Sequence, residues 1–325
     1  MTRFEPGSFA PIAVARRSGF DESLHHGAAA VVDADGRVVA ALGDPALAVY
    51  LRSSLKAFQA TAMVELGLDV ADPLLALVAA SHSGEARHLD GVRRLLDEHG
   101  LSVDDLGNTP TLPYGAVARA ESIRAGAAPS SLFQNCSGKH AGMLATCRVN
   151  DWTVDDYLAT DHPLQWAITE MIEALGATVH QVGVDGCGAP THALGLADAA
   201  RALGRLAQAD SPVLRAMQAH PDMVGGDRRD VTAWMRAVPG LAAKDGAAGV
   251  MALTMVRGER RGWSAVFKIA DGSDAARRAV IPAALAAMGV DVEAVSAAAA
   301  RDGDVVAEVL GGGRPVGYID PLPWT

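Results

Sequence analysis

The order of strand-like and helix-like stretches restricts the fold of this chain more than any other sequence feature. Residues 27–42 are typical of a β-hairpin, because two runs rich in Ala and Val flank a turn at Asp35 and Gly36. Helical patterns follow, and strand patterns return at residues 249–256 and 263–270. We therefore expect an antiparallel sheet assembled from both ends of the chain, with a helical part inserted between them.

Apolar periodicity, together with the usual start and stop residues, predicts the helices. The pair Asp72 and Pro73 marks a helix start, and Gly67 and Gly100 mark helix ends. The expected helices cover residues 53–66, 72–80, 87–99, 136–149, 161–175, 192–207, 211–219 and 273–289, and a short strand covers 179–184. The stretch 107–135 is rich in Pro, Gly and Ser, so we expect it to be irregular.

These elements suit one large domain of the mixed α/β (α+β) class. The chain has 325 residues and 50% of them are hydrophobic, so a sizeable core is available. We expect a single domain over residues 1–325. Its sheet part should comprise about residues 1–50 and 240–325, and its helical part about residues 51–239.

The charge of the chain argues against nucleic acids and membranes as partners. The net charge is −10 with no basic stripe, and we expect short pairs such as Arg228 and Arg229 to lie in solvated turns. No apolar run reaches the length of about 18 residues that predicts a membrane span, and the first residues lack the pattern of a secretion signal. The odd number of cysteines does not suit a disulfide framework. We expect a cytoplasmic, reduced protein.

Lysine is rare, with 4 residues against 24 arginines. An Arg guanidinium stays protonated in proteins, whereas a Lys amine can lose its proton and then act as a base or bind a metal. Lys56, Lys139 and Lys244 lie beside Ser, Cys or Gly and are candidate functional residues. The alternative is that codon bias removed lysine and left a random remainder. Lys268 alternates with apolar residues and is expected to face solvent.

Ser53 and Lys56 form the first candidate catalytic pair. They are three residues apart at the head of an expected helix, so their side chains should share a face and come near enough to touch. A neutral amine there can accept the Ser proton and turn a weak hydroxyl into a nucleophile. The alternative is an ordinary helix start with Ser53 as the cap, since Ser-x-x-Lys pairs also arise by chance.

Two further segments carry residues that suit serine chemistry. The polar stretch Ser81–Glu85 ends an apolar helix, which is typical of a pocket wall but also of a helix end whose carbonyls need partners. Lys244 enters a strand through a Gly-rich turn. A strand-edge Lys beside a Ser-x-x-Lys helix is the arrangement of the penicillin-recognising serine enzymes.

A third group suits a metal. Cys136, Lys139 and His140 share a helical face, and Cys187 lies in a second Gly-rich loop. Two thiolates and one nitrogen would leave a zinc ion an open position, as in catalytic zinc sites. Spacing alone selects Cys136, His140 and Cys187, because the high pKa of Lys makes it an uncommon ligand. The alternative is that these cysteines are small buried hydrophobes, the role we expect for Cys147.

Ten segments spread over most of the chain share one resemblance. They are His25–Gly43, Arg52–Lys56, Ala80–Ser83, Asn135–Met143, Asp161–Pro163, Asp185–Cys187, His220–Pro221, Met223–Gly226, Lys244 and Lys268–Gly272. Together they resemble the asparaginase II family, the Rhizobium-type enzymes with a serine β-lactamase-like fold. The block Asn135–Met143 is the most specific of these segments.

The resemblance implies an L-asparaginase with two Ser–Lys pairs, Ser53 with Lys56 and Ser81 with Lys244. One activated Ser attacks the side-chain amide of L-asparagine, and water cleaves the resulting acyl-enzyme to give L-aspartate after ammonia has left. We expect Ser53 to attack, and Ser81 to relay protons or help hold the oxyanion.

The same resemblance implies a zinc site, substrate contacts and a homodimer. The implied zinc ligands are Cys136, Lys139 and Cys187, with Lys139 in place of the His140 that spacing selects. The implied substrate-binding residues are Arg52, His140 and Asp185. Two other functions stay open: a glutaminase or another serine hydrolase of the penicillin-recognising group, and a zinc- or amino-acid-binding module without turnover. A binding module has no evident need for two Ser–Lys pairs.

Overall fold

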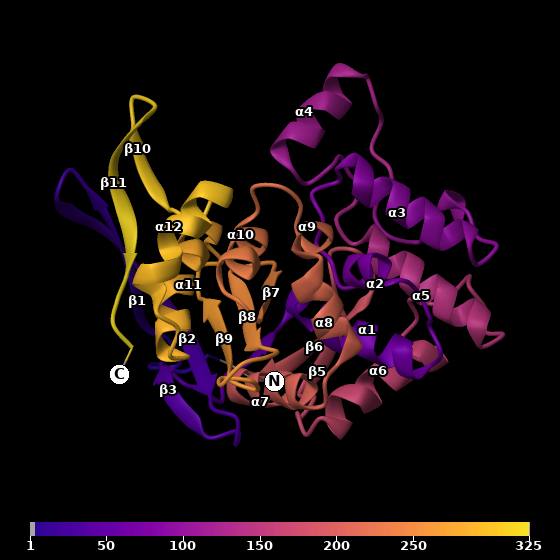
Figure 1. Ribbon diagram of the computed structural model, residues 1–325, viewed down its shortest axis with the longest axis horizontal. Helices are drawn as coiled ribbons and strands as arrows, with labels where there is room; N and C mark the ends of the chain where they lie inside the picture. Colours follow the sequence, from indigo (N-terminus) through magenta and orange to yellow (C-terminus); the bar gives the residue numbers. More distant parts are fainter. Residues whose placement is uncertain (1–3, 325) are drawn as a thin grey trace.

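A large antiparallel sheet from both ends of the chain dominates the computed structural model, which describes residues 4–324 (Figure 1). Seven strands follow the order β10-β11-β1-β2-β9-β8-β7, and β3 pairs with β2. Their bounds are β1 (Ala10–Arg17), β2 (Phe20–Val32), β3 (Val38–Leu42), β7 (Leu241–Gly246), β8 (Val250–Met255), β9 (Ser264–Ile269), β10 (Glu308–Gly311) and β11 (Arg314–Pro321). The expected sheet, with its hairpin over residues 27–42, is confirmed.

The pairing of β2 with β9 joins the two ends of the chain. Gly27 lies opposite Ile269 and Ala30 opposite Val266, and the end of β2 from Ala28 to Val32 is fully buried. Burial of both faces explains why this strand reads as a continuous apolar run. The C-terminal hairpin β10–β11 extends the sheet by pairing with β1 and was not among the expected strands.

Most of the helices lie in the middle of the chain, and two more lie between the strands β9 and β10. Their bounds are α1 (Lys56–Glu65), α2 (Asp72–Val78), α3 (Ala86–Asp97), α4 (Ala116–Arg124), α5 (Ser137–Val149), α6 (Pro163–Ala174), α7 (Leu196–Gln208), α8 (Pro212–Ala219), α9 (Pro221–Val224), α10 (Asp230–Ala237), α11 (Asp274–Ala287) and α12 (Val292–Asp302), with 3-10 turns η1 (Arg52–Leu55) and η2 (Val103–Asp105). None of the helices in this described part is both long and apolar enough to cross a membrane.

A second, three-stranded sheet corrects the expected helix 192–207. Strands β4 (Ala48–Tyr50), β6 (Pro190–Gly195) and β5 (Gln181–Val184) pair in that order, so α7 begins only at Leu196. The strand β6 is buried along its whole length and is paired on both sides. A short, fully buried segment that mixes Thr191 and His192 with apolar residues shows no period that would distinguish a helix from a strand.

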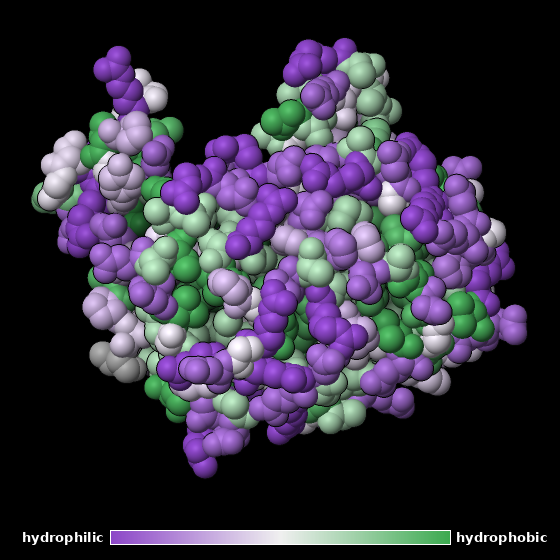
Figure 2. All heavy atoms as spheres, viewed as in Figure 1, coloured by the Kyte–Doolittle hydropathy of each residue, from purple (hydrophilic) through white to green (hydrophobic). Residues whose placement is uncertain are grey.

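The helix α4 corrects the expectation that residues 107–135 are irregular. Ala118 is its only buried residue, while Val117 and Ile123 are exposed, so the sequence shows no apolar stripe there. The helix projects from the body of the molecule, as does the hairpin β10–β11, and Figure 2 shows the notch between these two projections.

Two glycines of α5 allow it to lie directly against α2. A Cβ atom on Gly138 would come within 2.4 Å of the Leu77 carbonyl oxygen, and one on Gly142 within 2.8 Å of the Val78 side chain. No other residue fits at this distance. The close approach brings the start of α5 next to the residues that follow α2.

Candidate active site

The hydroxyl of Ser81, just after α2, is the meeting point of two lysines. The Nζ atom of Lys244 on β7 lies 2.7 Å from Ser81 Oγ, and the Nζ atom of Lys56 at the start of α1 lies 3.2 Å from it. All three side chains are buried, with at most 2% of each residue exposed. Ser81 therefore bridges two amines that come from distant parts of the chain.

Ser53 lies beside this group in η1, but its predicted contact with Lys56 is absent. The Lys56 amine donates instead to the Ala80 carbonyl, to Ser81 Oγ and, at 3.1 Å, to Cys136 Sγ. The prediction assumed an α-helix from Ser53 onward, whereas α1 begins at Lys56. Ser53 is partly exposed, so a substrate can reach it more readily than the enclosed Ser81.

The pKa of Lys244 is lowered to about 8. Burial is the main cause, and the nearby Lys56 adds to it, while the Asp245 carboxylate opposes both. Asp245 Oδ1 lies 2.6 Å from Lys244 Nζ. Burial alone would raise the pKa of Asp245, but the attraction of Lys244 and other cations holds this pKa well below its usual range. An amine with a pKa near 8 can both accept and donate a proton close to neutral pH.

The two predicted zinc-binding cysteines, Cys136 and Cys187, are buried, and each thiol shifts the pKa of the other. Their contact lowers the pKa of Cys136 and raises that of Cys187, so the proton stays on Cys187. Lys139 Nζ lies 3.2 Å from Cys187 Sγ, and the two sulfurs raise the pKa of Lys139 despite its burial. Lys139 Nζ thus contacts one sulfur and lies close enough to the other for its charge to act on it, and two sulfurs with one nitrogen are a donor set that suits zinc.

His140 does not join these sulfurs. Its Nδ1 atom is 2.7 Å from the hydroxyl of Tyr157, which orients the ring, and burial lowers its pKa. Among residues 4–324, no three His, Cys, Asp or Glu side chains are placed to hold a metal ion together. The set that spacing selected, Cys136 with His140 and Cys187, is therefore not assembled.

Arg52 and Asp185 form an ion pair next to Ser53. Arg52 Nε lies 2.7 Å from Asp185 Oδ1. Burial alone would raise the pKa of Asp185, but the hydrogen bond and charge of Arg52, together with the Gly186 amide and the charge of Lys139, lower this pKa below its usual value. The two residues implied as substrate contacts are thus held together as a pair of opposite charges.

The backbone of Arg52 is strained, with a φ of 53°. Arg52→Gly and Arg52→Ala both remove the guanidinium, but only glycine adopts this φ without a steric cost. We expect the Gly variant to be more stable than the Ala variant by about 0.5–1 kcal/mol, the left-handed penalty less the backbone entropy of glycine. Urea unfolding of the two variants measures this difference, and an Ala variant of equal or greater stability would exclude strain at this position.

Comparison with known families identifies the family of this chain. The chain matches the family model described as L-asparaginase II over residues 13–321. The protein belongs to the L-asparaginase II family. No individual curated protein matches it. Membership of the asparaginase family implies a hydrolase that acts on amides, and the matched range contains the whole Ser81 and Cys136 region.

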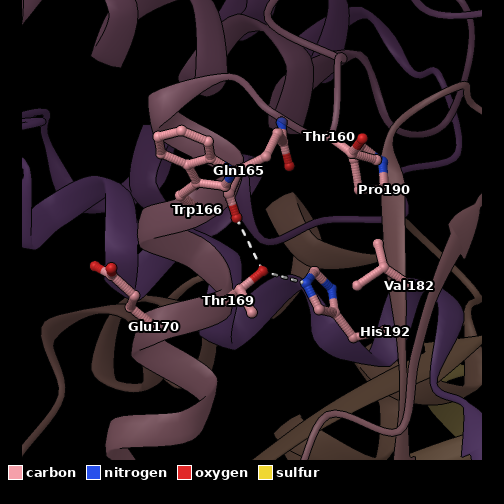
Figure 3. Close-up of a pocket in the computed structure, with 8 residues that line it drawn as sticks. All are labelled: Thr160, Gln165, Trp166, Thr169, Glu170, Val182, Pro190 and His192. Atoms are coloured by element: carbon pink, nitrogen blue, oxygen red, sulfur yellow. Dashed lines mark hydrogen bonds between the residues drawn. The ribbon is translucent and has the colours of Figure 1, made fainter.

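A separate cavity of about 320 Å³ lies between α6 and the small sheet (Figure 3). It is lined by Thr160, Gln165, Trp166, Thr169, Glu170, Val182, Pro190 and His192, and so by none of the predicted site residues. Thr169 Oγ1 is 2.9 Å from His192 Nε2 but donates its proton to the Gln165 carbonyl. The histidine therefore does not activate this hydroxyl, and the cavity lies apart from the group formed by Ser81, Lys56 and Lys244 in this L-asparaginase II family member.

The sequence indicated no functional role for Arg229, and we expected Arg228 and Arg229 to lie together in a solvated turn. In the structure Arg229 is largely enclosed and forms an ion pair of 2.6 Å with Asp245, while Arg228 is exposed. Tyr157, the partner of His140, was missed as well. No local pattern marks either residue, because their partners lie far away in sequence or across the fold.

Proposed function

We propose that the protein hydrolyses the side-chain amide of L-asparagine to L-aspartate and ammonia through an acyl-enzyme. The main support is the Ser81 hydroxyl that bridges the buried amines of Lys56 and Lys244, in a chain of the L-asparaginase II family. Amide hydrolysis needs a nucleophile, a base for its proton and an acid for the departing nitrogen. A serine between two amines can pass that proton from one to the other.

In the proposed sequence, Ser53 attacks the amide carbon because it is the more accessible of the two serines. Lys56 takes the Ser53 proton when the side chains approach each other in the substrate complex; such contacts are often long without substrate. Ser81 can pass this proton between Lys56 and Lys244. One of the two amines then donates it to the amide nitrogen, the C–N bond breaks, and ammonia leaves while Ser53 carries the acyl group. Water then attacks the ester, and an amine takes a proton from it. The C–O bond to Ser53 breaks, the amine returns the proton to the Ser53 oxygen, and L-aspartate is released.

Substrate binding would use the charges beside Ser53. Free asparagine carries an ammonium and a carboxylate, and Arg52 and Asp185 present the opposite charges at 2.6 Å from each other. We propose that Asp185 binds the ammonium, Arg52 binds the carboxylate, and His140 lines the pocket. When asparagine binds, the ion pair between Arg52 and Asp185 would be replaced by one ion pair from each residue to the substrate. These two ion pairs would orient the amide toward Ser53.

We also propose a serine β-lactamase-like fold and a homodimer. The fold is supported by the antiparallel sheet with a Ser-x-x-Lys segment and a strand Lys at one site, the combination found in penicillin-recognising enzymes. The homodimer rests on the family resemblance alone. Light scattering of the purified protein would show a mass of about twice that of the chain if the dimer forms.

A zinc ion held by Cys136, Lys139 and Cys187 is part of the proposal. The sulfur and nitrogen donors fit this metal, and Lys56 connects them to Ser81 because its amine contacts both Cys136 and Ser81. When bound, zinc would supply a positive charge that helps to position substrate.

We expect purified protein to contain about one zinc per chain, and Cys187→Ala to lose most of it, because a thiolate ligand is removed. Metal analysis after dialysis measures this. Cys147→Ala is the matched control, since Cys147 is also a buried cysteine but packs inside α5. Undiminished zinc in Cys187→Ala would refute the site, and equal loss in both variants would point to general destabilisation.

Parallel assays separate the proposed function from its alternatives. We expect ammonia release from L-asparagine to exceed that from L-glutamine, with no turnover of a chromogenic cephalosporin. Preference for glutamine would identify a glutaminase, and cleavage of the cephalosporin would identify a penicillin-type substrate. Tight binding of asparagine without ammonia release would identify a binding module and refute the proposal.

A further inference from the structure

The carboxylate of Asp245 is shared between two cations. Its Oδ1 atom accepts a hydrogen bond from Lys244 Nζ at 2.6 Å, and its Oδ2 atom accepts one from Arg229 Nη2 at 2.6 Å. Only 11% of the Asp245 side chain and 14% of the Arg229 side chain are exposed, so water screens neither contact strongly. Each cation therefore receives one oxygen of the carboxylate.

The same guanidinium also holds the backbone of Ser81. Arg229 Nη1 donates to the Ser81 carbonyl at 3.0 Å, and the ring of Tyr114 covers the guanidinium at 4.7 Å from its centre. Arg229 thus connects the serine and the counter-ion of Lys244 through a single planar group. A guanidinium can do so because its donors point in fixed directions.

We infer that Arg229 is a positioning residue that keeps Lys244 available as a base, by taking half of the Asp245 carboxylate and fixing Ser81 in front of the amine. The inference rests on the proposed function for its catalytic meaning. Without Arg229, the full negative charge of Asp245 would act on Lys244. The amine would then stay protonated to higher pH and could not accept a proton near neutrality.

The charges around Lys244 determine the direction of this effect. Asp245 on the same strand favours the protonated amine, whereas Lys56 on α1 and Arg229 before α10 disfavour it. Arg277 on α11 acts on Asp245 from a further side and is itself paired with Asp230. Removal of Arg229 deletes one of the two cations that oppose protonation, so the pKa of Lys244 must rise.

The small number of lysines allows a direct test. With only 4 lysines in the chain, NMR of protein labelled with ¹³C at lysine Cε can follow each titration, and the signal missing from Lys244→Met assigns Lys244. We expect Arg229→Met to raise the titration midpoint of Lys244 by about one pH unit or more, because one close cation is lost. Arg229→Gln, which is neutral but still polar, should show the same direction and serves if the Met variant does not fold.

Two variants serve as controls for charge and location. Arg229→Lys keeps the positive charge, so its midpoint should lie closer to that of the wild type than the midpoint of Arg229→Met does. Arg228→Met changes the neighbouring residue, which is exposed and pairs with Asp304, and should leave the midpoint unchanged. An unchanged midpoint in both Arg229→Met and Arg229→Gln would overturn the inference.

The activity profile gives the second readout. A base must be deprotonated, so kcat/KM for asparagine should rise with pH through about 8 in the wild type, where Lys244 titrates. In Arg229→Met this rise should move to higher pH by the same shift as the NMR midpoint. A loss that is equal at every pH would indicate a merely structural role and count against the inference. If the wild type releases no ammonia but the NMR midpoint shifts, the proposed function fails while the role of Arg229 toward Lys244 stands.

Discussion

Ser53→Ala is expected to lower kcat/KM for L-asparagine by about 10⁴-fold or more, the order of loss seen when a serine hydrolase loses its nucleophile. The hydroxyl that attacks the amide would be absent, while the group formed by Ser81, Lys56 and Lys244 would remain because it makes no hydrogen bond to Ser53. An enzyme-coupled assay of ammonia release measures the rate, and circular dichroism checks that the variant is folded.

Ser81→Ala separates attack from proton relay. It should lower the rate by about 10²–10⁴-fold, the usual contribution of positioned proton transfer. An acyl group should still form slowly on Ser53, and intact-protein mass spectrometry with asparagine should detect it. No adduct should appear in Ser53→Ala. A modified Ser81 peptide in that variant, or near-normal ammonia release from it, would reverse the roles of the two serines.

Asp230→Ala is expected to lower the free energy of unfolding by about 3–5 kcal/mol. Asp230 Oδ2 lies 2.6 Å from Arg277 Nη1, with 3% and 4% of the two side chains exposed. Removing the carboxylate leaves a buried guanidinium without its main partner, which costs far more than the pair contributes. Urea unfolding at neutral pH measures the change.

The exposed pair of Arg94 and Glu98 is the control for this experiment. It is a helical pair at 2.7 Å with both side chains largely exposed, so Glu98→Ala should change stability by about 0.5 kcal/mol or less. Removing both buried charges, with Asp230→Ala and Arg277→Met together, should cost less than Asp230→Ala alone. Similar losses for the buried and exposed pairs would contradict this account.

Local patterns were sufficient for most of the fold. The hairpin over residues 27–42 and the helices α3, α5 and α11 agree with the sequence within a few residues, because periodicity, caps and turn residues act over short distances. The predictions for the segments that form strand β6 and helix α4 were wrong, for opposite reasons. The strand β6 is buried on both faces although it contains Thr191 and His192, and α4 has only one buried residue, so neither shows a period of apolar residues.

The candidate site was likewise predicted only in part from the sequence. The sequence by itself determined which residue types were available: the Ser-x-x-Lys segment, the cysteines of α5 and the Asp185 loop, and the scarce lysines. Only the tertiary structure decided what each one contacts. Lys56 contacts Ser81 and Cys136 rather than Ser53, and His140 contacts Tyr157 rather than the cysteines. Arg229, which we expected in a surface turn, pairs with the counter-ion of Lys244. The physical reason is burial: a charged or polar group removed from water must find a partner, and that partner is set by the packing of distant segments rather than by spacing along the chain.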